Sequence, residues 1–407
     1  MPTNLPAVAR ARYFAWAIVL GTLCYAIFRV GIGAAMIGSP DAKLRIAPDN
    51  AAALVAVSTR ELNTLQRGRL SQASVLARQA YAREPISSGA LRQLGAISSF
   101  KGDPEKARAL VQQSERLSKR DFTAQLILIE DAVNRGDVTV ALRHYDIALR
   151  TSKRASAVLF EPLSSATNDD ALITPLAQLL AKRPPWANFY LLQAASTSPS
   201  PRNIANLIIT LQKTGFPVAP LALESLTGRL LQTQDYQSAW AVFSTVDQAA
   251  VRDKLRDPGF KNERRIGLPF DWSFDVSGSA SAEVVVDAKG NHMAFNAPVG
   301  TGGLVARQMT LLPPGNYKLS TIVAENNVGN DNAPMWRLRC ADNSSVLAVL
   351  PLPIINTAAR RAQVNFTVKG CEAQWLELIL TATDDPQGVV GAIDHVAISR
   401  ISKGVGA

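Results

Sequence analysis

Hydrophobic and polar positions follow three different patterns along this chain. Residues 13–37 are almost all apolar, residues 48–250 carry apolar residues at helical spacing, and short alternating runs between Gly, Pro and Asn begin near residue 257. The pattern predicts a multidomain α plus β protein, with a transmembrane helix, an α-solenoid of helical repeats and an antiparallel β-sandwich. The predicted boundaries are 1–12 for a cytoplasmic N-terminus, 13–37 for the transmembrane helix, 38–256 for the repeats, 257–402 for the β-sandwich and 403–407 for a tail.

The apolar stretch is long enough to cross a bilayer, since a helix needs about 20 residues to span the hydrocarbon core. Arg10 and Arg12 precede it, and basic residues stay on the cytoplasmic side. We therefore expect a single-pass protein of the bacterial inner membrane with its C-terminal bulk in the periplasm. Arg29 interrupts the run, and we expect its side chain to reach toward the outer interface. A cleaved signal peptide is the alternative; the length of the run favours an uncleaved anchor.

The helical stretch contains an internal repeat of 34 residues, which decays beyond Ser152. In each unit a glycine is followed five residues later by a small residue, and by another seven residues after that. Glycine supports a tight turn between helices, and a small side chain lets two helices approach closely. The predicted repeat-packing residues are Gly68, Ala73 and Ala80, then Gly102, Ala107 and Ser114, then Gly136, Ala141 and Ala148.

This spacing resembles the tetratricopeptide repeat (TPR), in which two antiparallel helices form each unit of a solenoid. Asp103 and Asp137 suit the N-terminal caps of second helices, and the motif returns in a different phase at Asp235 and Ala239. The family's large aromatic in the first helix is missing, which indicates divergent repeats. We predict about five to seven helix pairs across residues 48–250. The resemblance implies a groove that binds an envelope protein; a spacer without a partner is the alternative.

The last third of the chain predicts an all-β sandwich, because short alternating runs are separated by turn residues throughout. The aliphatic and aromatic positions of these runs would form the core between two sheets. The predicted strands are 270–276, 282–286, 293–297, 303–311, 315–325, 334–340, 346–351, 362–368, 374–381 and 391–399.

Three phrases in this region resemble jelly-roll carbohydrate-binding modules of the galactose-binding-like type. They are DPGFKN at 257–262, LPPGNYKLS at 312–320 and IDHVAIS at 393–399. The resemblance implies glycan binding and makes a polysaccharide a candidate partner. Many such modules hold calcium with a Glu after the opening Phe, where this chain has Lys261, while Asp394 matches a closing-strand ligand. Because calcium needs several oxygen ligands, we predict no metal site.

Tryptophan rings can stack on sugar rings when they are exposed, although buried tryptophans more often fill the core. Trp272, Trp336 and Trp375 are the three tryptophans of the predicted β-sandwich. Trp272 follows the polar Asp271 near the entry of the domain. We therefore predict Asp271 and Trp272 as the candidate glycan contacts and the other two rings as core.

Three cysteines give a prediction about the compartment. Cys24 lies in the apolar stretch, whereas Cys340 and Cys371 both lie in the predicted β-sandwich. A disulfide between Cys340 and Cys371 fits an oxidising compartment such as the periplasm. Two buried free thiols are the alternative.

The net charge of +10 is unevenly distributed along the chain. Residues 1–265 hold 33 Lys and Arg against 21 Asp and Glu, a balance of +12, and residues 266–407 hold 10 against 12, a balance of −2. Such a basic half favours an acidic partner, for example anionic lipid or an acidic polymer. A solvated, Arg-rich helical surface is the alternative, because the sequence contains no dense basic run.

No catalytic motif is present in the sequence: it contains no HExxH, P-loop or nucleophile elbow. Its three histidines, His144, His292 and His395, lie in unrelated contexts, and we expect His144 to be exposed on a repeat helix. We predict no catalytic residue, no cofactor and no nucleic-acid binding.

The leading functional hypothesis is a membrane-anchored scaffold of the bacterial cell envelope, linked to surface polysaccharide synthesis or export. Its repeats would bind a protein, and its β-sandwich would bind a glycan. This link to polysaccharide rests on analogy of architecture. The alternatives are a purely structural assembly subunit without sugar affinity, and an envelope enzyme with a cryptic active site in the β-domain.

Overall fold

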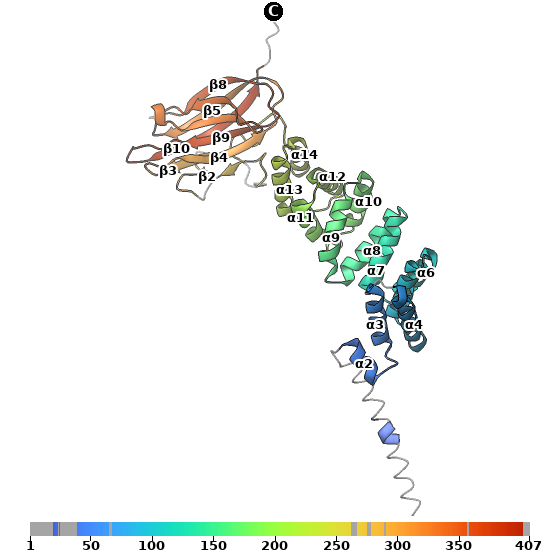
Figure 1. The fold of residues 1–407 in the computed structure, drawn as a ribbon. Coiled ribbons are helices and arrows are strands. Elements are labelled where there is room, and N and C mark those ends of the chain that lie inside the picture. The colour runs from blue at the N-terminus through green and yellow to red at the C-terminus, as the bar shows by residue number, and fades with distance from the viewer. Residues whose placement is uncertain are drawn as a thin grey trace, which may run out of the picture. The chain divides into compact units, whose positions relative to one another are not determined.

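The structure is a computed structural model (Figure 1) that describes residues 19–22, 24, 39–64, 67–261, 267–274, 278–288, 290–355 and 358–401. Residue contacts divide the chain into two compact units, Met1–Leu159 and Phe160–Ala407. The division falls inside one helix, so helices contribute to both units, and the second unit also contains every described strand.

The first unit is built from helices that pack as consecutive pairs. Helix α3 packs against α4, α5 against α6, and α7 against α8. The predicted TPR-like pairing of neighbouring helices is therefore present in all three units of the 34-residue repeat. The helices are α2 (Pro40–Ile46), α3 (Ala51–Asn63), α4 (Arg67–Arg83), α5 (Ser88–Phe100), α6 (Pro104–Leu117), α7 (Phe122–Asn134) and α8 (Val138–Thr151).

Short polar side chains start these helices at the predicted places. The carboxylate of Asp103 accepts from the backbone N–H of Lys106 at 3.0 Å, and that of Asp137 accepts from Val140 at 3.0 Å. Each bond satisfies one backbone donor that has no partner inside its helix. The two predicted caps are thereby confirmed, and Asp235 caps a later helix in the same way.

The helices of the second unit stack in a different order. Helix α10 packs against α12, α11 against α13, and α12 against α14, so that helices two apart in the sequence become neighbours. Large rings fill the space between them: Phe160, Trp186 and Tyr190 have centroids 5.5–6.4 Å apart. The helices are α9 (Ala155–Ala166), α10 (Asp170–Ala181), α11 (Ala187–Thr197), α12 (Pro201–Gln212), α13 (Pro220–Gln232) and α14 (Tyr236–Val246).

The strands form two antiparallel five-stranded sheets, with orders β1-β4-β9-β6-β7 and β2-β3-β10-β5-β8. Every predicted strand has a counterpart, and the first is described only at Ser273–Phe274, next to residues 275–277 that lie outside the described ranges. The strands are β1 (Ser273–Phe274), β2 (Ser281–Asp287), β3 (Gly290–Ala297), β4 (Gly303–Thr310), β5 (Gly315–Asn326), β6 (Met335–Cys340), β7 (Val346–Pro351), β8 (Arg360–Val368), β9 (Gln374–Leu380) and β10 (Val389–Arg400).

One continuous core lies between the two sheets. Alternate side chains of β6 and β9 point into this core, namely Trp336, Leu338, Leu376 and Leu378. Tyr317 of β5 enters the same core from the other sheet and stacks on Phe366 with ring centroids 5.7 Å apart. The antiparallel β-sandwich is therefore confirmed as the fold of the C-terminal region.

Within the second unit, helix α14 is attached to the β-sandwich by aromatic contacts. Trp240 and Phe243 of α14 lie with ring centroids 5.0 and 5.4 Å from that of Phe270. Phe270 precedes β1 in the connection between Val246 and Ser273, which contains the predicted domain boundary at 256/257. The last helix and the sandwich thus share a packed apolar contact.

The predicted transmembrane helix lies almost entirely outside the described residues, which within it are limited to 19–22 and 24. Among the helices that the structure describes, none has both the length and the apolar character to span a bilayer. Residues 1–12 and 403–407 are likewise outside the described ranges. The membrane anchor stays a prediction from the sequence.

Candidate functional site

The predicted glycan contact Trp272 is part of the core of the β-sandwich. Its side chain belongs to a residue that is 4% exposed, and its ring lies 5.6 Å from Phe260 and 5.8 Å from Trp336, centroid to centroid. Its indole Nε1–H donates to the backbone carbonyl of Asp257 at 3.1 Å. A sugar at the surface would not reach this ring, so the structure corrects the prediction.

Asp271, the other predicted glycan contact, is also buried and has protein partners. Its Oδ1 accepts from Arg256 Nη1 at 2.5 Å and from the backbone N–H of Trp272 at 2.8 Å. Arg256 donates as well to Asp247, the residue that follows α14. Burial alone would lower the pKa of Arg256, but its bonds to the two carboxylates outweigh burial and raise that pKa. Asp271 therefore fastens the sandwich to the end of α14.

Trp375 is the tryptophan of the sandwich that the fold leaves partly open. It is half-buried, whereas Trp336 is fully buried. Because Leu376 and Leu378 of β9 point into the core, Trp375 and Glu377 face outward. The alternation in the sequence QWLELIL indicates this orientation, and the prediction that Trp375 fills the core is wrong.

Three arginines lie near Trp375 and Glu377 on the outer face of the β1-β4-β9-β6-β7 sheet. In the strand register, Glu377 of β9 lies between Arg307 of β4 and Arg337 of β6. Trp375 lies opposite Arg339 of β6. We call these five residues the arginine face. The sequence did not predict it, because its members come from three strands that are up to 70 positions apart.

The charges of the arginine face are only partly balanced. The carboxylate of Glu377 is nearly inaccessible and accepts from Arg337 Nη2 at 2.8 Å and from Arg339 Nε at 2.9 Å. Arg307 instead places its guanidinium over the ring of Trp375, 4.8 Å from the centroid. Within the part of the chain that the structure describes, Arg307 has no carboxylate partner. Such a stacked guanidinium keeps its N–H edge free to bind an acceptor.

A hollow of about 310 Å³ borders the arginine face. It follows the paired strands β1 and β4 and is lined by Ser273, Phe274 and the segment from Leu304 to Arg307. A ligand lying on the sheet could therefore enter a depression beside the guanidinium of Arg307. The outer face offers both a stacked cation and space next to it.

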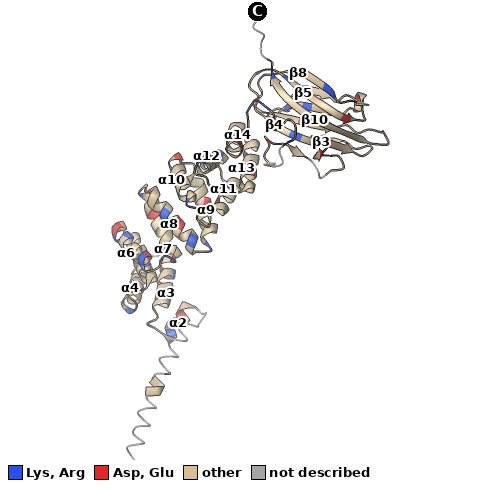
Figure 2. Ribbon diagram, turned by 180° about the vertical axis from the view of Figure 1, so that it is seen from behind, with Lys and Arg blue, Asp and Glu red and all other residues tan. Residues whose placement is uncertain are grey.

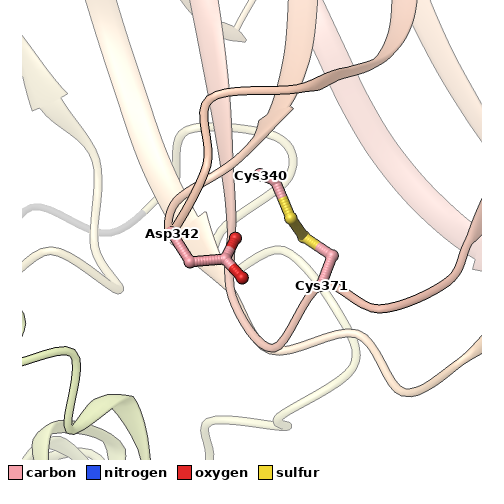
Figure 3. A group of neighbouring side chains, drawn as sticks. All are labelled: Cys340, Asp342 and Cys371. Atoms are coloured by element: carbon pink, nitrogen blue, oxygen red, sulfur yellow. A yellow bond between two sulfur atoms is a disulfide. The ribbon is translucent and has the colours of Figure 1, made fainter.

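The disulfide between Cys340 and Cys371 is confirmed (Figure 3). It links the end of β6 to the loop before β9, with the two Cα atoms 5.7 Å apart. The carboxylate of Asp342 lies near both sulfurs, with all ligand atoms of this group within 4.8 Å of one another. Because both sulfurs are bonded to each other, neither is a thiolate, and the group does not form a metal site.

Within the described residues, Asp394, which matches a closing-strand calcium ligand of the similar modules, belongs to no such cluster. Asp394 lies exposed on β10, and Lys261 donates its backbone N–H to Asp257 at 2.7 Å. Over the described ranges, the structure brings together no further group of three His, Cys, Asp or Glu side chains close enough for a metal ion.

The alanines among the repeat-packing residues are buried between the helices of the first unit. Ala73, Ala80 and Ala148 have no exposed surface, and Ala107 and Ala141 are 5% and 6% exposed. Their methyl groups fill the contact between paired helices, where a longer side chain would push the two backbones apart.

The other repeat-packing residues have different roles. Ser114 is buried, and its hydroxyl donates to the backbone carbonyl of Ser88 in the partner helix at 2.8 Å. Gly102 and Gly136 adopt positive φ angles of 80° and 69° in the turns between helices, a conformation that glycine adopts without strain. Gly68 lies within α4.

Gly95 is a packing residue that the 34-residue pattern did not single out. A Cβ atom at this position in α5 would lie 2.5 Å from Val111 Cγ2 and 3.0 Å from the carbonyl oxygen of Ala107, both in α6. The two helices therefore approach as closely as their backbones allow. Gly95 occurs once rather than in every repeat, so periodicity could not reveal it.

The expectation that His144 is exposed is wrong. His144 is 1% exposed, and its Nδ1 lies 2.7 Å from Gln125 Oε1 in the neighbouring helix. Its Nε2 lies 3.1 Å from Arg143 Nη2. Burial and the adjacent Arg143 charge lower its pKa to about 4, while the more distant Asp131 opposes the shift. His144 is a neutral packing residue at pH 7, with Nδ1–H as the donor to Gln125.

Charged residues are scattered over the helices rather than gathered into one block (Figure 2). Several arginines of the first unit form ion pairs between helices, such as Arg92 with Asp121 at 3.0 Å and Arg108 with Asp131 at 2.8 Å. The basic excess of the N-terminal region is thus partly used for packing.

No protein-family model and no curated protein matches this sequence. Among solved structures, the carbohydrate-binding module of Cellvibrio mixtus lichenase 5A in complex with cellotriose is 12% identical over 38% of this chain and its whole length, with a TM-score of 0.24. The enzymatically active domain of bacteriophage CBA120 tailspike protein 4 is 15% identical over 32% of this chain, with a TM-score of 0.24. This chain spans 19% of that structure.

The helical region also has a neighbour among solved structures. The Cut9–Hcn1 hetero-tetramer of the APC/C is 12% identical over 53% of this chain and 36% of its own chain, with a TM-score of 0.25. At these identities and TM-scores the three likenesses carry no argument about what this chain binds. Its function has to be inferred from its own residues.

Proposed function

We propose that this chain is a non-enzymatic, membrane-anchored binding protein of the bacterial cell envelope, whose β-sandwich binds a glycan on the arginine face. The supporting observation is the half-buried Trp375, which lies with three arginines on the outer face of one sheet. An aromatic ring beside several hydrogen-bond donors suits the apolar faces and hydroxyl groups of sugars.

The proposed location is the periplasmic side of the inner membrane, in a complex for surface polysaccharide synthesis or export. The apolar stretch at residues 13–37 supports the anchor. The disulfide supports an oxidising compartment, since cytoplasmic thiols are kept reduced. Protease added to intact spheroplasts should digest the C-terminal bulk; its complete protection would contradict this topology.

The helical repeats would bind an envelope protein. Support comes from the stacked helix pairs, which give a repeat array an extended surface for a partner. Pull-down with the detergent-solubilised full chain, followed by mass spectrometry, would name candidates. A direct partner should bind the purified chain in a two-component assay, and binding unaffected by deletion of residues 48–151 would exclude the first repeats as its site.

Glycan binding by the β-sandwich is tested with the full chain in detergent micelles against a panel of neutral and acidic polysaccharides. We expect binding to at least one polymer and a loss of about tenfold for Trp375→Ala, because this change removes the ring over which Arg307 is held. Ile322→Ala is the matched control, because Ile322 is half-buried on the outer face of the other sheet. No binding across the panel would remove glycan binding.

A purely structural role is the second candidate, and the edge strand β7 favours it. Val346 and Val349 are 56% and 41% exposed there, beside Arg337 and Arg339 of β6. Exposed aliphatic residues next to arginines are typical of protein–protein contacts. Val349→Lys should weaken assembly with a protein partner in this case and leave polysaccharide binding unchanged.

A further inference from the structure

The arginine face has an excess of positive charge at the surface of a domain that is otherwise slightly acidic. Three guanidinium groups meet one carboxylate, a formal balance of +2, although residues 266–407 as a whole carry −2. The excess is concentrated on Arg307, because Glu377 is occupied by Arg337 and Arg339. A ligand that completes this face would bring negative charge.

Stacking of Arg307 also limits how a neutral sugar could bind. Its guanidinium lies 4.8 Å from the centroid of the Trp375 ring and covers that face of the indole. A neutral sugar would therefore contact the guanidinium of Arg307 rather than the covered face of the Trp375 ring. The planar guanidinium carries several N–H donors at its edge, and this fork suits a bidentate acceptor such as a carboxylate.

Further donors are available on the same face. Arg337 and Arg339 bind Glu377 through their Nε and Nη2 atoms, and in the described part of the chain neither Nη1 atom has a hydrogen bond. Their side chains remain 38% and 22% exposed. The hollow beside Arg307 provides room for a ring that carries the acid group.

From this arrangement we infer that the arginine face binds a polysaccharide whose sugars carry carboxylate groups, with Arg307 holding one carboxylate. The inference rests on the proposed glycan binding and adds the class of glycan. An acidic protein segment is the competing occupant. The hollow beside a single fixed guanidinium favours a ring-borne acid over a flexible acidic side chain.

The probe is polygalacturonate, and its reference is the same polymer after chemical reduction of the carboxyl groups to alcohols. Binding of both to the full chain in detergent micelles is measured by affinity electrophoresis at low and moderate salt. We expect the reduced polymer to bind about tenfold more weakly, and the difference to shrink as salt rises, since screening weakens exposed charge pairs.

Two variants separate the arginine face from the overall basic charge of the chain. Arg307→Ala should lower the affinity for polygalacturonate about tenfold, and Arg307→Lys should give an intermediate loss, because lysine keeps the charge without the planar fork. Arg361→Ala is the control: Arg361 is exposed on the other sheet, and its loss removes the same charge. Near-identical thermal unfolding of the variants would show that each is folded.

The possible outcomes test different parts of the proposal: the class of glycan, the site, and glycan binding itself. Equal binding of the intact and the reduced polymer overturns the acidic class and leaves glycan binding standing. Equal losses for Arg307→Ala and Arg361→Ala attribute binding to bulk charge and overturn the site. Polyglutamate that binds as tightly as polygalacturonate, with the same dependence on Arg307, assigns the face to an acidic protein. No binding of any polysaccharide removes the proposed function itself.

Discussion

The repeat hairpins of the first unit and the arginine face of the β-sandwich are specified in different ways. In the hairpins, contacts join helices that follow one another, and the same small residue returns every 34 positions. On the arginine face, Arg307, Arg337 and Trp375 meet only through the pairing of β4, β6 and β9. Contacts between consecutive helices produce a repeating pattern in the sequence, whereas the pairing of distant strands produces no such pattern. The two regions should therefore respond to different perturbations.

Loss of the disulfide should have the largest effect and should be confined to the β-sandwich. Replacing both Cys340 and Cys371 by Ala opens a loop with a sequence separation of 31. The unfolded chain gains conformational freedom, and the free energy of unfolding should fall by about 3–4 kcal/mol. Urea unfolding followed by tryptophan fluorescence measures this change.

Reduction of the wild-type chain serves as the control and should give a similar shift. Hydrogen exchange of the peptides from α3 to α8 should stay unchanged in both cases. A loss of protection in those helices would mean that the two regions are not independent.

His144 should make the first unit sensitive to acid. Its pKa is about 4 in the folded chain and near 6.5 when unfolded, so the unfolded state binds more protons between these values. The stability of the first unit is therefore complete above pH 6.5 and should fall as the pH drops toward 4, by about 3 kcal/mol. Hydrogen exchange of α7 and α8 peptides at pH 4.5 and 7 reports this loss.

His144→Gln removes the titrating group and should flatten this dependence on pH. The carboxylates of the protein contribute equally to the pH dependence of both chains. The difference between the two pH profiles therefore isolates the contribution of His144. An identical pH profile for the variant would contradict a buried neutral imidazole.

Enlarging a buried alanine should separate two paired helices. Ala107→Leu inserts a branched side chain into the α5–α6 contact, and overpacking should cost about 2 kcal/mol. Ala109→Leu, on the exposed side of the same helix, should change stability by less than about 0.5 kcal/mol. Equal effects at the two positions, measured by chemical unfolding, would show that the α5–α6 contact accommodates a leucine side chain without strain.

Glycine substitutions should give the smallest effects, with opposite signs at two helical positions. Gly95→Ala improves helix propensity but places a Cβ 2.5 Å from Val111 Cγ2, so we expect a net loss of about 1 kcal/mol. Gly228→Ala meets nothing within 4 Å on α13 and should stabilise by about 1 kcal/mol. Stabilisation at both sites would contradict the close approach of α5 and α6.

Much of the fold could be predicted from sequence because its signals are local. The caps at Asp103 and Asp137 and the strand alternation of β9 each depend on a few neighbouring residues. Three consecutive helix pairs, α3–α4, α5–α6 and α7–α8, follow the predicted repeat, whereas α10 to α14 pack mainly with the helix two positions away. The stacking of helices two apart after α9 could not be predicted, because large rings such as Trp186 set spacings that follow no period.

The candidate site was predicted less well than the fold. The alternation in QWLELIL indicates that Trp375 faces outward, but nothing in the sequence near Trp272 shows that another segment covers its ring. Phe260 and Asp257, which come from the connection before β1, cover Trp272. His144 was misplaced for the same reason, since its cover is Gln125 of another helix.

The amino-acid sequence by itself determined where helices and strands form, which small residues recur at helix contacts and which cysteines could pair. Periodicity, capping and turn chemistry act over a few residues, so they can be recognised without the fold. Only the tertiary structure decided which tryptophan ring stays partly exposed, which arginine lies over that ring and which histidine is buried. Burial and charge pairing depend on segments far apart in the chain, and their approach is a property of the packed molecule.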